Sequence, residues 1–319
     1  MALVPINAQH ALQILAGTQG RNTGHSYEED LANAINQLPV PLNINTLPTS
    51  GNVFQTSNEA LTLILYIAQK LNIQKITHLF SVATGGLATS SKSQGVMFNG
   101  QNIKKCKSDI LIKINHIHDI GVSVKQCNNK NPTNAQVYFT TATGFSNLLR
   151  NNQINVSQVA ETALKQFCGD AGFNPIDNNA TQGRVVDHRR YFWEEINTAG
   201  RQEWENTFST YQDEISRILL QKAYSNDPFA PTFILHKTKL TTTIPEVAIY
   251  TIDELIQKSR SYNLFSTEPY RINKGSFRDS DGVVHLAPRF GIFQMQRAGN
   301  KQHPTQLQFN LKSGYFYVI

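Results

Sequence analysis

Three residues near the middle of the chain have the types and spacing for phosphoryl chemistry. The run Asp109–Ile114 is typical of a strand, and Val122–Gln126 is typical of a second strand after a turn-like segment, so a hairpin is predicted. Side chains alternate along a strand, which places Ser123 and Lys125 on one face. Asp109 and Lys125 on adjacent strands can bind a divalent metal and stabilise charge on a phosphorane.

A second carboxylate is needed near this hairpin, because Mg²⁺ is usually held by more than one oxygen ligand. The segment Ser26–Leu38 carries an apolar stripe that predicts a helix. With about 100° per residue, Glu28 borders that stripe and Glu29 faces water. Glu28 is therefore the candidate helix acid.

These motifs resemble those of a known family. Gly24-x-x-Tyr27-Glu28-x-x-Leu31 is similar to the first-helix signature of the PD-(D/E)xK nucleases, and 107–112 with 121–125 is similar to their D…(D/E)xK hairpin. The resemblance is greatest to type II restriction endonucleases and covers about residues 20–170. It implies Mg²⁺-dependent cleavage of double-stranded DNA by a homodimer. It also implies Asp109 and Glu28 as metal ligands and Lys125 as the catalytic lysine.

Ser123 departs from the family pattern, because Asp or Glu usually stands at this catalytic position. Either Glu28 or Glu59 then has to supply the missing carboxylate, or the site is degenerate and does not cleave. Ser123 stays a candidate catalytic residue by its place in the motif.

Two other clusters have simpler interpretations. His116-x-His118-Asp119 contains ligands for a transition metal, but it lies in a predicted turn without a distant third ligand, so a solvated loop is expected. Arg189-Arg190 precedes aromatic residues that can stack on bases. Core aromatics beside surface arginines are the expected arrangement.

The last predicted hairpin, 289–297 with 305–312, has one apolar and one polar face. Phe293 and Met295 alternate with amides, as do Leu307, Phe309 and Leu311 in the partner strand. Amide and guanidinium groups bond purine edges in the major groove, which admits a β-ribbon. A solvated polar face is the alternative. The candidate DNA contacts are Arg289, Gln294, Gln296, Arg297, Lys301, Gln308, Asn310 and Lys312.

The remaining patterns set the expected architecture. Helices are predicted from a Thr56-x-x-Glu59 capping box, over 157–167 and over 200–224, and late strands over 232–240 and 246–250. A Thr251-x-x-Glu254 box predicts a further helix. We expect an α/β fold with a restriction-endonuclease-like mixed central sheet flanked by helices. Residues 1–228 would form the nuclease-like core with a helical insertion, and 229–319 a β-rich C-terminal region.

Composition narrows the functional classes. Hydrophobic residues make up 40% of 319, which excludes global disorder, and the formal net charge of +6 is compatible with a polyanionic partner. Basic residues gather in 92–130 and 271–319 and acidic ones in 194–214. Three cysteines without a CxxC pair argue against a disulfide framework or structural zinc.

The sequence has neither a signal-peptide pattern nor an apolar run of membrane-spanning length. We expect a cytoplasmic prokaryotic protein that acts without a membrane or a small-molecule substrate. A restriction-type DNA endonuclease is the leading hypothesis. The alternatives are a non-cleaving DNA-binding protein on the same scaffold, and a nuclease acting on RNA or structured DNA.

Overall fold

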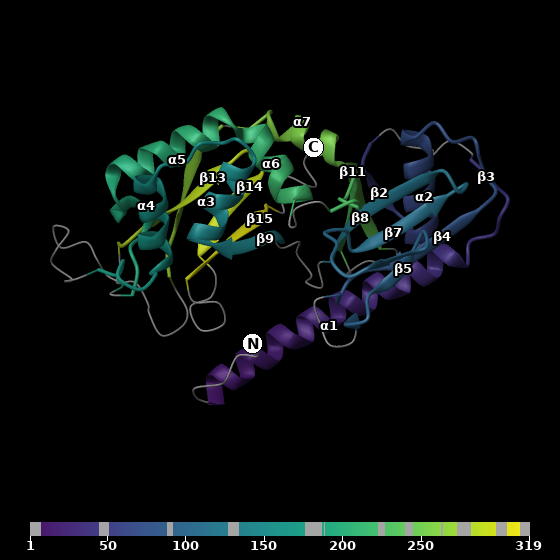
Figure 1. Cartoon of the computed structure of the whole chain (residues 1–319), viewed down its shortest axis with the longest axis horizontal. Coiled ribbons are helices and arrows are strands. Elements are labelled where there is room, and N and C mark those ends of the chain that lie inside the picture. The colour runs from purple at the N-terminus through teal and green to yellow at the C-terminus, as the bar shows by residue number, and fades with distance from the viewer. Residues whose placement is uncertain are drawn as a thin grey trace. The chain divides into compact units, whose positions relative to one another are not determined.

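The computed structural model describes residues 8–44, 51–87, 92–126, 134–175, 187, 189–222, 227–239, 245–262, 264–272, 282–297 and 305–312. The chain forms two compact units (Figure 1). The six-stranded unit comprises mainly Ile14–Ala135 and Arg217–Ile256. The five-stranded unit comprises mainly Gln136–Ser216 and Gln257–Lys312. Among the described residues, no helix has the length and apolar character needed to cross a membrane.

The sheet of the six-stranded unit is mixed. Its order among the described strands is β2-β11-β10-β8-β7-β4. Strand β10 runs parallel to β8, while the other neighbours are antiparallel. The strands are β2 (Val53–Gln55), β4 (Leu79–Ala83), β7 (Ile110–Ile114), β8 (His118–Gln126), β10 (Phe233–Lys239) and β11 (Glu246–Thr251).

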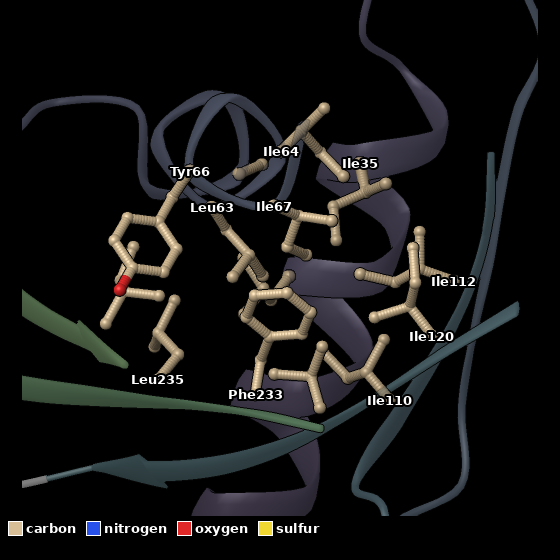
Figure 2. Packing of buried hydrophobic residues seen from close by; sticks show 14 of the residues in the cluster. Ile35, Leu63, Ile64, Tyr66, Ile67, Ile110, Ile112, Ile120, Phe233 and Leu235 are labelled. Atoms are coloured by element: carbon tan, nitrogen blue, oxygen red, sulfur yellow. The ribbon is translucent and has the colours of Figure 1, made fainter. Parts of the chain in front are cut away.

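Two helices cover the apolar core of this unit, α1 (Ala8–Asn36) and α2 (Glu59–Lys70). Figure 2 shows Ile35 of α1 and Leu63 and Ile67 of α2 packed with side chains of β7 and β10, and all three are fully buried. Helix α2 begins after Asn58, whose side chain accepts a hydrogen bond from Leu61 N at 2.9 Å. The expected Thr56 cap is therefore wrong, since Thr56 Oγ1 instead accepts from Asn58 N.

The five-stranded unit is a sheet backed by helices. The described strands follow the order β12-β13-β14-β15-β9. An aromatic cluster joins helices and sheet: the rings of Phe208 and Phe290 lie 4.5 Å apart and those of Phe145 and Phe309 lie 4.6 Å apart. The elements are β9 (Ala135–Thr141), α3 (Ala142–Asn151), α4 (Gln158–Cys168), α5 (Thr198–Thr210), β12 (Ser266–Tyr270), β13 (His285–Phe290), β14 (Phe293–Arg297) and β15 (Gln306–Leu311). Helix α6 (Gln212–Gln221) begins among the residues of this unit and ends among those of the six-stranded unit, which resume at Arg217.

Smaller elements complete the chain. Strands β1 (Leu42–Asn43) and β3 (Lys75–Ile76) pair, as do β5 (Val96–Phe98) and β6 (Gln101–Ile103). A short 3₁₀ helix spans Trp193–Glu195, and α7 spans Ile252–Ser259. The predicted Thr251–Glu254 capping box is confirmed by reciprocal hydrogen bonds of 2.8 and 3.0 Å.

The α/β class, the mixed sheet with flanking helices and the β-rich C-terminal part are confirmed. Two expectations differ in detail. The helix expected over 200–224 is two helices with a break at Tyr211, where the sequence has neither Pro nor Gly to mark a stop. The compact units also do not follow the expected boundary at 228, because β10 and β11 return to the sheet that contains β7 and β8.

Gly291, in the β13–β14 turn, provides a stability test. It has φ +48°, and a Cβ there would lie 2.0 Å from Ser259 Oγ. Gly282 has φ +84°, but a Cβ there would meet no described atom within 4 Å. We expect Gly291→Ala to lower the free energy of unfolding by about 1–3 kcal/mol more than Gly282→Ala, because only Gly291 adds overpacking to the backbone strain. Equal losses in denaturant unfolding would contradict this close approach.

Candidate active site

The carboxylate of Asp109 is held by the neighbouring strand. Its Oδ2 accepts hydrogen bonds from Ser123 Oγ at 3.0 Å, Val124 N at 2.7 Å and Lys125 Nζ at 2.9 Å. Lys125 Nζ also donates to the Val124 carbonyl at 2.8 Å. The three hydrogen bonds to Asp109 all reach the same oxygen. Its Oδ1 therefore retains acceptor capacity among the described residues.

Main-chain bonds fix the position of Asp109. Its N–H donates to Val122 O at 2.8 Å, and its carbonyl accepts from Thr84 N at 2.9 Å and Gly85 N at 3.3 Å. In the antiparallel register of β7 and β8, Ile110 lies opposite Val122. The predicted hairpin is confirmed, with β7 starting one residue after Asp109. The structure thus brings Asp109, Ser123 and Lys125 together.

Glu28 lies inside the six-stranded unit and Glu29 in solvent, as the helical angles indicated. Glu28 is 8% exposed, and its Oε2 is buried without a hydrogen-bond partner among the described residues. Burial, and then the charge of Asp109, raise the pKa of Glu28 to about 8, although Lys125 and Lys92 act in the opposite direction. Glu29 instead pairs with Lys92 at 2.9 Å. Glu28 and Asp109 thus form an electrostatically coupled pair of carboxylates.

Gly85 makes room for the Glu28 carboxylate. A Cβ on Gly85 would lie 1.5 Å from Glu28 Oε2 and 2.7 Å from its Cδ. The same residue donates its N–H to the Asp109 carbonyl, so one loop position touches both acids. Sequence reasoning identified Gly85 only as part of a loop. Nothing in the local pattern indicated which side chain needs this space.

Two more basic residues, His236 and Lys107, lie near enough to Lys125 for its charge to act on them. His236 of β10 aligns with Lys125 in the parallel register, and burial together with the charge of Lys125 lowers the pKa of His236 to about 4. Burial, followed by the charge of Lys125, lowers the pKa of Lys107 to about 8, with Asp109 and Asp227 opposing. At neutral pH His236 is therefore uncharged. The sequence did not identify His236, because only the long crossover brings β10 beside β8.

The acids fit a divalent cation. Among the described residues, no group of three or more His, Cys, Asp or Glu side chains is arranged to hold a metal. The carboxylates of Asp109 and Glu28, however, match the coordination preference of Mg²⁺, which commonly binds one or two protein carboxylates together with water and substrate phosphates. The observation that supports this fit is the buried Oε2 of Glu28, which has no hydrogen-bond partner in the described part of the chain and feels the charge of Asp109.

The alternative acid, Glu59, is committed elsewhere. It forms an ion pair with Lys237 at 2.6 Å and accepts a hydrogen bond from the Tyr27 hydroxyl. Ser123 contributes its hydroxyl to Asp109 and supplies no second carboxylate. Glu28 is therefore the acid that the fold couples to Asp109.

The competing His cluster does not form a metal site among the described residues. Asp119 pairs with Lys113 at 3.1 Å, and the ring of His116 stacks on His78 with centroids 3.6 Å apart. His118 starts strand β8 rather than lying in the turn, which corrects the expected loop. Phe192 and Trp193, after Arg189 and Arg190, are core aromatics as expected, with 0% and 1% exposure.

The C-terminal hairpin has the expected apolar face, but its polar face is less open than predicted. Phe293, Met295, Leu307, Phe309 and Leu311 are fully buried. In the register of β14 and β15, Gln294 lies opposite Asn310 and Gln296 opposite Gln308. Gln294 and Asn310 are themselves buried, at 7% and 3% exposure, and both are hydrogen-bonded to the side chain of Gln296.

The other candidate DNA contacts have partners within the five-stranded unit or lie outside the described residues. Arg289 bonds Ser266 at 3.2 Å, Lys312 pairs with Glu268, and Gln308 bonds Gln136 at 2.8 Å. Arg297 lies over the ring of Phe192. Lys301 lies outside the described residues. These side chains can contact DNA only if their present ion pairs and hydrogen bonds are replaced by contacts with the nucleic acid.

Comparison with known proteins finds a distant structural likeness. The restriction endonuclease MspI, solved in complex with its cognate DNA, aligns with 79% of this chain and 78% of its own, with a TM-score of 0.42 and 9% sequence identity. No protein-family model matches the chain, and no curated protein matches it.

The raised pKa of Glu28 predicts how the stability of the protein depends on pH. This pKa is about 8 in the folded chain and near 4.5 when unfolded, so the folded state retains a proton that the unfolded chain releases as the pH rises between these values. The contribution of this group to the free energy of unfolding is therefore most favourable below about pH 4.5, and it decreases as the pH rises to about 8. We expect Glu28→Gln to remove this loss, up to about 1.4 kcal/mol per pH unit.

The measurement is denaturant unfolding with chelator at several pH values across this window. Glu29→Gln is the matched control, because its side chain is 54% exposed and one residue away on the same helix. If the free energy of unfolding has the same pH dependence in Glu28→Gln and Glu29→Gln, the raised pKa of Glu28 is contradicted.

Proposed function

We propose that the chain is a Mg²⁺-dependent endonuclease that hydrolyses phosphodiester bonds in double-stranded DNA at a specific sequence. One observation carries the proposal: Asp109, directly before β7, is joined to Lys125 of β8, and the charge of Asp109 acts on the buried carboxyl group of Glu28. A lysine and two acids in close proximity are the groups that metal-assisted phosphodiester hydrolysis requires.

Each residue has a role in this proposal. Asp109, through Oδ1, and Glu28, through Oε2, would hold the metal. A bound Mg²⁺ supplies Lewis acidity and lowers the pKa of a water. Lys125 lies beside Asp109, where its ammonium would stabilise charge that develops on the phosphate. Ser123 keeps Asp109 oriented through its hydroxyl. Glu28 has to release its proton before it can act as a ligand.

The proposal extends to partners and setting. The C-terminal strands would contact DNA, with Lys301 and Lys312 on phosphates and Gln294, Gln296, Gln308 and Asn310 on bases, aided by Arg289 and Arg297. We further propose a homodimer of the restriction type in a prokaryotic cytoplasm. A methyltransferase gene beside the coding sequence would support the restriction-modification role.

A second candidate follows from Ser123. The hydroxyl at this position gives a site with one carboxylate fewer than the resembled family pattern, which favours a DNA-binding protein that does not cleave. Plasmid that stays intact with Mg²⁺ but is retained in binding assays would favour this candidate. Cleavage of RNA or structured DNA in preference to duplex would favour the third alternative.

Asp109→Ala should abolish cleavage while keeping or strengthening DNA binding, because a carboxylate near a phosphate repels it when no metal is bound. Lys125→Ala should lower the single-turnover rate by about 10²–10³-fold or more, as expected for loss of transition-state charge stabilisation. Lys113→Ala is the matched control, since Lys113 lies on the neighbouring strand but pairs with Asp119. Plasmid cleavage with Mg²⁺ and with chelator is the measurement. Full activity of either site variant would exclude the assignment.

Gly85→Ala tests the space around Glu28. Its Cβ would displace the carboxylate, so we expect a loss of cleavage comparable with that of Glu28→Gln. Gly24→Ala is the control on the same helix as Glu28, because a Cβ there meets nothing within 4 Å and alanine favours a helix by about 1 kcal/mol over glycine. Retained activity in the folded Gly85 variant would show that Glu28 is not a ligand.

DNA binding in Ca²⁺ tests the C-terminal strands. Lys301→Ala and Lys312→Ala should each weaken binding to every duplex and reduce the salt slope by about 0.9. Gln308→Ala should cost about 1–3 kcal/mol on the cognate duplex alone. Uniform loss in all variants would make the strands an electrostatic surface without base reading.

A further inference from the structure

A cavity of about 400 Å³ in the five-stranded unit has no role in the proposed cleavage. Its volume lies within the roughly 300–1,000 Å³ typical of sites for small ligands. The lining combines cationic, amide and apolar side chains: Arg190, Arg297, Gln294, Gln296, Met295 and Phe167. These three chemistries together restrict the class of ligand.

Arg297 is held in a fixed orientation at the cavity wall. Its guanidinium carbon lies 4.3 Å from the ring centre of Phe192 and 5.3 Å from that of Phe167. It donates to Tyr191 O and to the Tyr270 hydroxyl, both at 3.2 Å. Among the described contacts these bonds use two of its five N–H donors. A rigid guanidinium with donors to spare is suited to an anion.

Arg190 adds a second positive charge. Burial, and then the charge of Arg297, lower the pKa of Arg190 to about 10, so it stays charged at neutral pH. Arg190 Nε lies 3.6 Å from Asp187 Oδ2, and Arg189 bonds both oxygens of the same acid at 2.7 and 2.9 Å. The guanidinium groups of Arg189 and Arg190 thus lie near the same carboxylate, that of Asp187.

The remaining acids near the cavity have their own partners. Glu268, which lines the cavity, is paired with Lys312, and Glu194, whose charge acts on Tyr270, bonds His285 at 3.0 Å. The arginine wall thus favours a bound anion. A phosphate group is the anion whose geometry matches the guanidinium fork.

The amides stand beside this cationic wall. Gln296 Nε2 donates to Gln294 Oε1 at 2.6 Å, and Gln296 Oε1 accepts from Asn310 at 3.2 Å. Among these contacts Gln296 keeps one N–H and one lone pair, the donor and acceptor that a nucleobase edge requires. Phe167, which also lines the cavity, provides apolar surface for a flat ring.

We propose that this cavity binds a single nucleotide unit, with its phosphate on Arg190 and Arg297 and its base edge on Gln294 and Gln296. The unit is either a free mononucleotide or a nucleotide extruded from a duplex, which enzymes acting on DNA accommodate in such pockets. The proposal goes beyond the cleavage function and does not depend on it, because the cavity residues are separate from Asp109, Lys125 and Glu28. It gives Gln294, Gln296 and Arg297, proposed above as contacts to duplex DNA, a single nucleotide unit inside the cavity instead.

Calorimetry of the full chain with the Asp109→Ala change, in chelator, tests binding without cleavage. Titrants are the four deoxynucleoside monophosphates and inorganic phosphate. We expect at least one nucleotide to bind about tenfold or more tightly than phosphate, a difference of roughly 1.4 kcal/mol. Gln296→Leu should reduce nucleotide affinity to that of phosphate, and Arg297→Lys should weaken both by about tenfold.

Gln136→Leu is the matched control, because Gln136 is an amide of the same sheet that does not line the cavity. Thermal unfolding checks each variant, and Gln296→Leu decides the question if Arg297→Lys does not fold. Equal affinity for all nucleotides and phosphate, unchanged by Gln296→Leu, would overturn the proposal.

A second arm distinguishes the two sources of the nucleotide. Duplexes carrying 2-aminopurine at successive positions report extrusion as a rise in fluorescence when the chain binds. A rise that Gln296→Leu removes identifies an extruded base as the ligand, whereas nucleotide binding without a rise identifies a free nucleotide. No base-dependent binding in either arm overturns the cavity proposal, while cleavage of plasmid by the unaltered chain remains a separate result.

Discussion

The pairing of strands β7 and β8 is the constraint on which the candidate site depends. Asp109 precedes β7, and its carboxylate is fixed by a main-chain N–H and two side chains of β8. A slip of one residue would turn Ser123 and Lys125 to the opposite face. The buried apolar residues Ile110, Ile112 and Val122 make such a slip costly, so the core specifies the geometry of the polar groups.

The same geometry destabilises the folded state, because it buries one carboxyl group near another. Glu28 is buried near Asp109, and no hydrogen bond among the described residues satisfies its Oε2. Buried carboxylates of like charge are tolerated where a cation completes them, or where one takes up a proton. Lys125 and Lys92 reduce the repulsion in part. Electrostatic strain of this kind is concentrated at functional sites rather than in ordinary cores.

The sequence predicted local features and missed those that depend on distant pairing. The hairpin, the inward direction of Glu28 and the apolar face of the last strands follow from periods of 2 and 3.6 residues. His236 and Gly85 did not, because the first needs a parallel strand from far along the chain and the second needs a neighbouring side chain. The burial of Gln294 and Asn310 was missed for a related reason: alternation assigns a face but does not say what covers it.

The parallel pairing of β10 with β8 has a consequence for biosynthesis. Thr232 donates its N–H to the carbonyl of Gly121, 111 residues earlier in the chain, where this pairing begins. A ribosome adding about 5–20 residues per second needs roughly 5 to 20 seconds to make that intervening length. Throughout this interval the edge of β8 that carries Lys125 lacks its neighbour. A nascent chain therefore contains all of the acidic and lysine groups of the site well before it has the sheet that buries them, which delays assembly of the site until most of the polypeptide has left the ribosome.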